Sequence, residues 1–135
     1  MLNFGELSLD ECGVSGTGKC SLDDYEGAML IAAMTARHAP WWIGDMLNSL
    51  DFKYGDKGAQ AIPLELLSLE YLERVKGVAK KVPYKNRRAD LSWTHHQQAS
   101  RLPKHMQPEW LERAAKEGWN SNQLRLAISD FVNKK

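Results

Sequence analysis

Residues 68–83 read SLEYLERVKGVAKKVP, and this stretch decides the fold of the chain. The opening serine favours a helix N-cap and the closing proline cannot continue a helix, so the sequence predicts a helix over 69–81. Leu72 and Val75 recur at helical spacing and give this helix an apolar face. A helical projection predicts that the opposite face is free of packing. That face carries Glu70, Glu73, Arg74, Gly77, Lys80 and Lys81.

Positive charge is concentrated in and just after this helix. Residues 69–88 hold seven Lys/Arg against two acids, although the whole chain has a net charge of only +1. Residues 1–68, by contrast, hold four Lys/Arg and ten Asp/Glu. A basic stretch on a structured helix is typical of a surface that contacts phosphate. A solvated helix face followed by a charged loop is the alternative interpretation, and charge alone does not separate the two.

A helix-turn-helix is predicted over about 55–82. A short helix over about 56–62 and a tight turn come first, and the apolar face of the longer helix can pack on the short one. Recognition helices contact base edges from their N-terminal turns and phosphates further along. The candidate base-reading residues are therefore Glu70, Glu73 and Arg74, because glutamate can accept from cytosine and arginine can bind guanine with two hydrogen bonds. The candidate phosphate contacts are Lys80, Lys81, Lys85, Arg87 and Arg88.

The predicted fold class is all-α, a multi-helix bundle with a short N-terminal arm or β-hairpin. Glycines and a short apolar–polar alternation place the arm at 1–20, and the helical DNA-binding domain covers 21–135. Capping residues and prolines predict where further helices begin and end. The expected helices cover 22–37 (opened by Ser21), 40–55 (opened by Pro40), 93–101 (opened by Ser92), 109–117 (closed by Gly118) and a last segment opened by Ser121.

Composition limits the other function classes. With 135 residues, 43% of them apolar and 26% charged, the chain fits one soluble domain. The longest apolar run, at 28–36, is too short to span a bilayer, and the acidic start lacks a signal-peptide pattern, so a cytoplasmic location is expected. The cysteines and histidines lack metal-ligand spacing, and no carboxylate pair or activated nucleophile is apparent. We therefore expect no metal, no cofactor and no enzymatic activity.

Other patterns suggest different kinds of binding. Residues 13–20 read GVSGTGKC and match the phosphate-binding loop GxxxxGK[ST] except at the last position. A nucleotide-binding function would need a parallel sheet to support that loop, and the chain reads helical. The adjacent His95 and His96 cannot both face one ligand, so buried hydrogen-bonding roles are expected. The five tryptophans are expected in the core rather than as a stacking platform for single-stranded nucleic acid.

Residues 41–125 resemble a known family in the order and spacing of their motifs. The motifs are WWIGD at 41–45, YG at 54–55, AQA at 59–61, RRADLSWTHH at 87–96, LP at 102–103, WL at 110–111 and GW at 118–119. In these motifs the chain resembles the LmbU-like helix-turn-helix regulators of actinomycete antibiotic clusters and related phage or plasmid proteins. The stretch after the predicted helix-turn-helix is also similar to the DNA-binding domain of ParB/KorB partition proteins.

The resemblance implies sequence-specific binding of double-stranded DNA and transcriptional control. A homodimer is expected, because helix-turn-helix modules gain specificity by pairing half-sites. A plasmid or phage partition or replication role stays open as the alternative. The candidate DNA-binding set also includes Ser68 and Tyr71, at the start of the helix. Leu66 stands where related chains have a turn glycine, and a non-glycine residue at positive φ costs about 1 kcal/mol or more.

Overall fold

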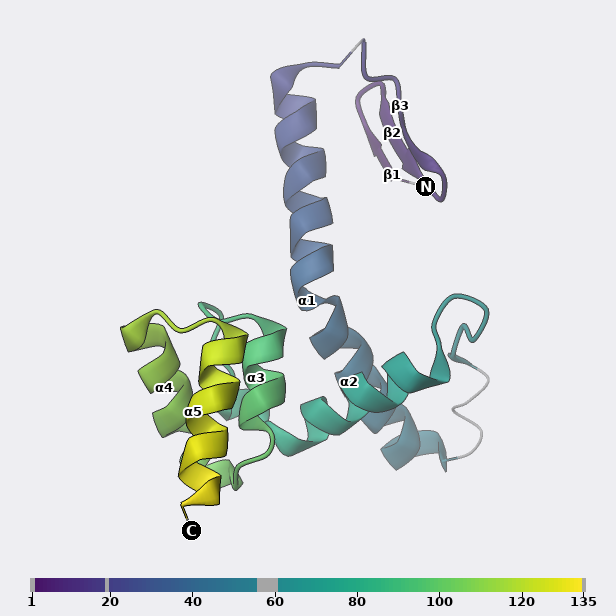
Figure 1. The fold of residues 1–135 in the computed structure, drawn as a ribbon. Coiled ribbons are helices and arrows are strands. Elements are labelled where there is room, and N and C mark those ends of the chain that lie inside the picture. Colours follow the sequence, from purple (N-terminus) through teal and green to yellow (C-terminus); the bar gives the residue numbers. More distant parts are fainter. Residues whose placement is uncertain (1, 19, 56–60, 135) are drawn as a thin grey trace. The chain divides into compact units, whose positions relative to one another are not determined.

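Helices dominate the described part of the chain, which covers residues 2–18, 20–55 and 61–134 of a computed structural model (Figure 1). Contacts group the chain into two units, Met1–Ala39 and Pro40–Lys135. The predicted helical body with a small N-terminal β element is confirmed at this level. Within the described ranges, no helix combines the length and apolar character that crossing a membrane requires.

The first unit contains a three-stranded antiparallel sheet beside the start of helix α1. Its strands follow one another in space in the order β1 (Leu2–Phe4), β2 (Leu7–Asp10) and β3 (Gly13–Ser15). Leu7 is only 2% exposed. A Cβ added at Gly27 of the helix would lie 3.5 Å from the Phe4 ring, so the sheet packs against this side of the helix. The predicted arm is therefore a sheet with one strand more than a hairpin.

Helix α1 (Leu22–Tyr54) begins at the predicted cap and runs across the predicted break. The Ser21 hydroxyl accepts from the Asp24 amide at 3.2 Å, and the Asp24 carboxylate accepts from the Ser21 amide at 3.2 Å. The prediction of two helices separated at Pro40 is wrong, because α1 continues through this residue. Proline holds φ near −65°, which is a helical value, and removes only one donor. The helix can therefore lose that hydrogen bond and continue.

Helices α3 (Trp93–Ala99), α4 (Gln107–Glu117) and α5 (Ser121–Asn133) form the larger core of the second unit (Figure 1). Its buried apolar side chains come from all three helices and from the segments next to them. They are Leu91, Ala99, Leu102, Trp110, Leu111, Ala114, Leu124 and Ile128.

Local capping signals explain where these helices begin and end. Ser92 caps α3 as predicted, with its hydroxyl accepting from the His95 amide at 3.3 Å. Gly118 ends α4 with φ of 67°, the left-handed value that glycine adopts without penalty. Helix α5 is capped by Asn120, one residue before the predicted Ser121. An asparagine caps a helix as well as a serine does, which explains the shift of one residue.

Helix α2 (Leu69–Lys81) begins at the predicted cap and follows an irregular turn. The Ser68 hydroxyl accepts from the Tyr71 amide at 3.1 Å. The short helix predicted over about 56–62 lies mainly outside the described residues. In the turn that follows, the Leu66 amide donates to the Pro63 carbonyl at 2.9 Å. No described non-glycine residue has positive φ, so the turn accommodates Leu66 without that strain.

The apolar face of α2 packs on the second half of α1. Leu47 of α1 meets Leu72 and Val75 of α2 in a small second core. The helices approach each other closely at Gly44, where an added Cβ would overlap the Val75 carbonyl oxygen and lie 2.8 Å from the Ala79 Cβ. This crossing therefore requires glycine at position 44.

Replacing Gly44 with alanine should destabilise the fold. Helix α2 would have to shift away from the new Cβ, and overpacking of this kind costs about 1–3 kcal/mol. Gly77→Ala is the matched control: Gly77 is a helical glycine with nothing within 4 Å of an added Cβ, so this change should stabilise by about 0.5–1 kcal/mol. Denaturant unfolding measures both. Equal stability of the two variants would contradict the close approach at Gly44.

Candidate nucleic-acid interface

The face of α2 turned away from α1 carries most of its charged side chains. Helical projection predicted this arrangement, and the structure confirms it. The exposed members of the predicted face are Glu70, Glu73, Arg74, Lys80 and Lys81, and Gly77 is half-buried. Acidic and basic groups share the first turns, whereas the last turn is basic only. Contact of these residues with DNA stays a prediction.

Arg74 lies near the middle of this face and is held only weakly. Its guanidinium lies 3.7 Å from the Glu70 carboxylate, with the two side chains 43% and 88% exposed. An exposed pair at this helical spacing contributes about 0.3–0.5 kcal/mol. A bidentate arginine–guanine contact discriminates by about 1–3 kcal/mol. Arg74 can therefore exchange Glu70 for a stronger partner at little cost.

Ser68 and Tyr71 have structural roles at the start of the same helix. The Ser68 hydroxyl caps α2, and Tyr71 packs, half-buried, against the small core around Leu47. These contacts fix the start of α2, and the base-reading candidates lie in the first half of the same helix.

A polar groove separates α2 from α3 beside the exposed face. Its volume is about 390 Å³, and its lining consists of Glu73, Arg74, Gly77, Val78, Lys81, Gln97, Gln98, Ser100 and Arg101. Sequence reasoning missed Gln97, Gln98 and Arg101, because only packing between helices brings them next to α2. The Arg101 guanidinium donates to the Arg125 carbonyl at 3.1 Å, which ties it to α5.

Besides Arg74, three basic residues of the 69–88 segment are paired with acids. Lys76 pairs with Asp51 of α1. Arg88 makes two hydrogen bonds to Asp90, at 2.9 and 2.8 Å, and this contact lowers the pKa of the Asp90 carboxyl. The third is Arg87. Across the residues that the structure describes, no ion pair involves Lys80, Lys81 or Lys85, so these lysines carry the uncompensated charge.

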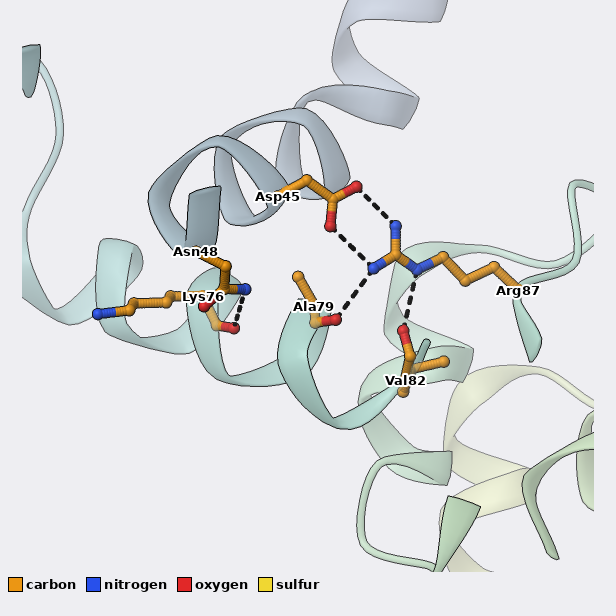
Figure 2. Close-up of polar contacts among 6 residues, drawn as sticks. All are labelled: Asp45, Asn48, Lys76, Ala79, Val82 and Arg87. Atoms are coloured by element: carbon orange, nitrogen blue, oxygen red, sulfur yellow. Dashed lines mark hydrogen bonds and ion pairs between the residues drawn. The ribbon is translucent and has the colours of Figure 1, made fainter. Parts of the chain in front are cut away.

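Arg87 points into the protein rather than toward solvent. Figure 2 shows its guanidinium bound to Asp45 of α1 and to two carbonyls at the end of α2. The bonds to the Asp45 oxygens are 2.8 and 2.9 Å long, and those to the Ala79 and Val82 carbonyls are both 3.0 Å. The guanidinium also lies 4.0 Å from the centre of the Trp41 ring, and the side chain is only 12% exposed. These contacts leave Arg87 little capacity to bind phosphate.

The chemistry of the α2 C-terminus explains this arrangement. In a continuing helix the Ala79 carbonyl would accept from residue 83, but that residue is a proline without an N–H. Arg87 supplies the missing donor. Its positive charge also lies at the negative end of the helix dipole.

His95 and His96 have separate structural roles. The His96 ring is fully buried, lies 2.7 Å from the Ser92 carbonyl through Nδ1, and accepts from the Arg88 amide at 2.9 Å through Nε2. His95 Nε2 lies 2.7 Å from the Trp119 carbonyl. The expectation of hydrogen-bonding histidines is therefore confirmed, with His96 the buried one. No cluster of three potential metal ligands occurs among the described residues.

The phosphate-loop-like stretch at 13–20 lacks the expected setting. Gly13–Ser15 is an exposed strand, β3, in an antiparallel sheet, whereas a phosphate-binding loop follows a parallel strand. Lys19 lies outside the described residues. Trp93, the tryptophan nearest the basic stretch in the sequence, is half-buried against the small core and does not form an open stacking surface.

The chain is similar to a curated transcriptional regulator. Transcriptional regulator NovE from Streptomyces niveus is 34% identical over 88 residues, which cover 65% of this chain. The chain spans about 41% of the length of that relative. No model of a protein family matches the chain. No solved structure matches it either.

Arg87→Lys should lower the free energy of unfolding by about 2 kcal/mol or more. A lysine cannot bind Asp45 and both helix carbonyls together, so polar groups lose their partners. Lys85→Ala is the control: this side chain is exposed, and its removal should change stability by no more than about 0.5 kcal/mol. Thermal or denaturant unfolding measures the stability of both variants. Similar stability of both variants would refute the anchoring role of Arg87.

Stability should fall as the pH drops below about 6.5, the ordinary pKa of histidine. Burial lowers the pKa of His96, so the unfolded chain takes up this proton at a higher pH than the folded chain does. The loss therefore accumulates between about pH 6.5 and the lower folded pKa, with a slope of at most about 1.4 kcal/mol per pH unit. His96→Gln, which does not titrate, should flatten this slope in unfolding curves. An unchanged slope would assign the pH dependence to other groups.

Proposed function

We propose that this chain binds double-stranded DNA through the exposed face of α2 and acts as a transcriptional regulator. The supporting observation is a helix whose apolar face is fixed on α1 while its opposite face presents both acidic and basic side chains. Similarity to a transcriptional regulator supports the regulatory role. The proposal treats residues 55–82 as a helix-turn-helix with α2 as its recognition helix.

The two ends of α2 have different tasks in this proposal. Glu70, Glu73 and Arg74 lie in the first half, where recognition helices contact base edges. The unpaired lysines Lys80 and Lys81 lie at the other end, where they would bind phosphates and make affinity strongly dependent on salt. Arg87 has a structural role that supports the orientation of the helix. Two copies of the chain would occupy two half-sites.

Arg74→Ala should weaken binding to a preferred site by about 10- to 100-fold, because one arginine–guanine contact is worth about 1–3 kcal/mol. The site is first selected from a random duplex pool, and affinity is then measured by gel shift on that duplex and on an unrelated one. Affinity for the unrelated duplex should change much less. An equal loss on both duplexes would remove Arg74 from the base-reading set.

Lys80→Ala/Lys81→Ala should weaken binding to every duplex. Loss of two phosphate contacts should reduce the slope of log affinity against log salt by about 2. Lys116→Ala, an exposed change on α4, is the control and should leave the slope unchanged. Unchanged affinity and slope in the double variant, together with unchanged binding by Arg74→Ala, would overturn the proposed interface.

A further inference from the structure

The first half of α1 is apolar around most of its circumference and exposed. Residues 28–36 read AMLIAAMTA and contain no charged side chain. Met29 is 67% exposed, Leu30 59%, Ile31 40% and Met34 42%. Helices with this character are normally buried, and contiguous exposed apolar surface usually marks an interaction site.

The sheet of the first unit covers only one side of this helix. Phe4 lies against Gly27, and Ala28 is buried at 5% exposure. At about 100° per residue, a helical projection places a second set of side chains on the opposite side. This seam consists of Leu22, Met29, Ala33 and Ala36, all exposed, with Leu22 at 73%.

We propose that this seam is the surface through which two copies of the chain associate, with their α1 helices antiparallel. Glu26 and Arg37 lie side by side in the projection, on one flank of the seam and near its opposite ends. In an antiparallel pair, Glu26 of each copy faces Arg37 of the other. In a parallel pair, two-fold symmetry would place these flanks on opposite sides of the contact, so neither Glu26 nor Arg37 would meet its opposite charge on the other copy. The charge pattern therefore selects a second copy in the antiparallel orientation.

The size of the seam sets the expected strength of this contact. Half of the curved surface of a helix about 24 Å long and about 10 Å in diameter amounts to on the order of 400 Å². A standard interface buries about 800 Å² per partner. The small residues Ala33 and Ala36 allow the two helices to approach closely, which improves packing over this limited area. We expect a dimer that dissociates at micromolar concentration and that paired DNA half-sites stabilise.

Sedimentation velocity of the full chain without DNA tests the surface. The wild-type chain should shift from monomer to dimer as its concentration rises through the micromolar range, and Met29→Glu should weaken this association at least about tenfold. Met34→Glu is the matched control: it makes the same change on the same helix, about 140° away from Met29. It should leave association unchanged. Circular dichroism confirms that both variants keep their helices.

Charge exchange tests the orientation and needs no apolar substitution. Glu26→Arg and Arg37→Glu should each weaken the dimer, and the double variant Glu26→Arg/Arg37→Glu should restore it. In a parallel pair the double variant would gain nothing over the single ones.

Three outcomes would overturn the proposal. The first is a wild-type chain that stays monomeric at all concentrations. The second is an equal effect of Met34→Glu and Met29→Glu on association. The third is a double charge variant that associates no more strongly than the single variants. The inference extends the proposed pairing of two copies on DNA, but its test contains no DNA. Failure of the dimer surface and failure of DNA binding are therefore seen separately.

Discussion

The second unit depends on the position of one guanidinium group. Pro83 ends α2 and leaves the Ala79 carbonyl without its helical partner, and Arg87 supplies the missing donor at 3.0 Å. The same group binds both oxygens of Asp45 and stacks on Trp41, two residues of α1. An arginine is needed because its planar guanidinium group can donate to several acceptors at once. The end of α2 and the second half of α1 are thereby fixed to each other.

A second, buried group of hydrogen bonds connects the end of α2 to α4. The side-chain amide of Gln107 is fully buried and donates to the Lys81 and Leu102 carbonyls at 3.0 and 3.1 Å. Its oxygen accepts from the side-chain amide of Asn86 at 3.0 Å. The donors and acceptors of this network are all satisfied in only one arrangement of the helices. The network therefore selects that arrangement as well as stabilising it. The end of α2 and the segment that follows α3 are thus both held against α4.

Local features of the fold could be predicted from the sequence, and distant pairings could not. A helix cap contacts groups only a few positions away in the chain. The capping roles of Ser68, Ser92 and Gly118 can therefore be identified from spacing alone. The partner of Arg87 is Asp45, 42 residues away, and no periodicity indicates such a contact. In the sequence, an arginine within a basic stretch indicates a phosphate contact as readily as a structural ion pair. For this reason Arg87 was included in the predicted interface. Pro40 misled for the opposite reason, because a residue that often opens a helix lies inside a continuous helix in the folded chain.

The same distinction applies to the candidate site. Helical spacing correctly predicted which residues of α2 face solvent, whereas Gln97 and Gln98 reach the groove only through the packing of α3. Lys80 and Lys81 also have a second explanation, because cations at a helix C-terminus stabilise its dipole by about 0.3–1 kcal/mol. Their position alone therefore does not require a DNA phosphate. Lys85 lies beyond the end of α2, is exposed, and has no ion pair among the described residues, so the dipole does not account for it. The helix dipole therefore explains two of these three lysines, and it leaves Lys85 to the phosphate contact proposed above.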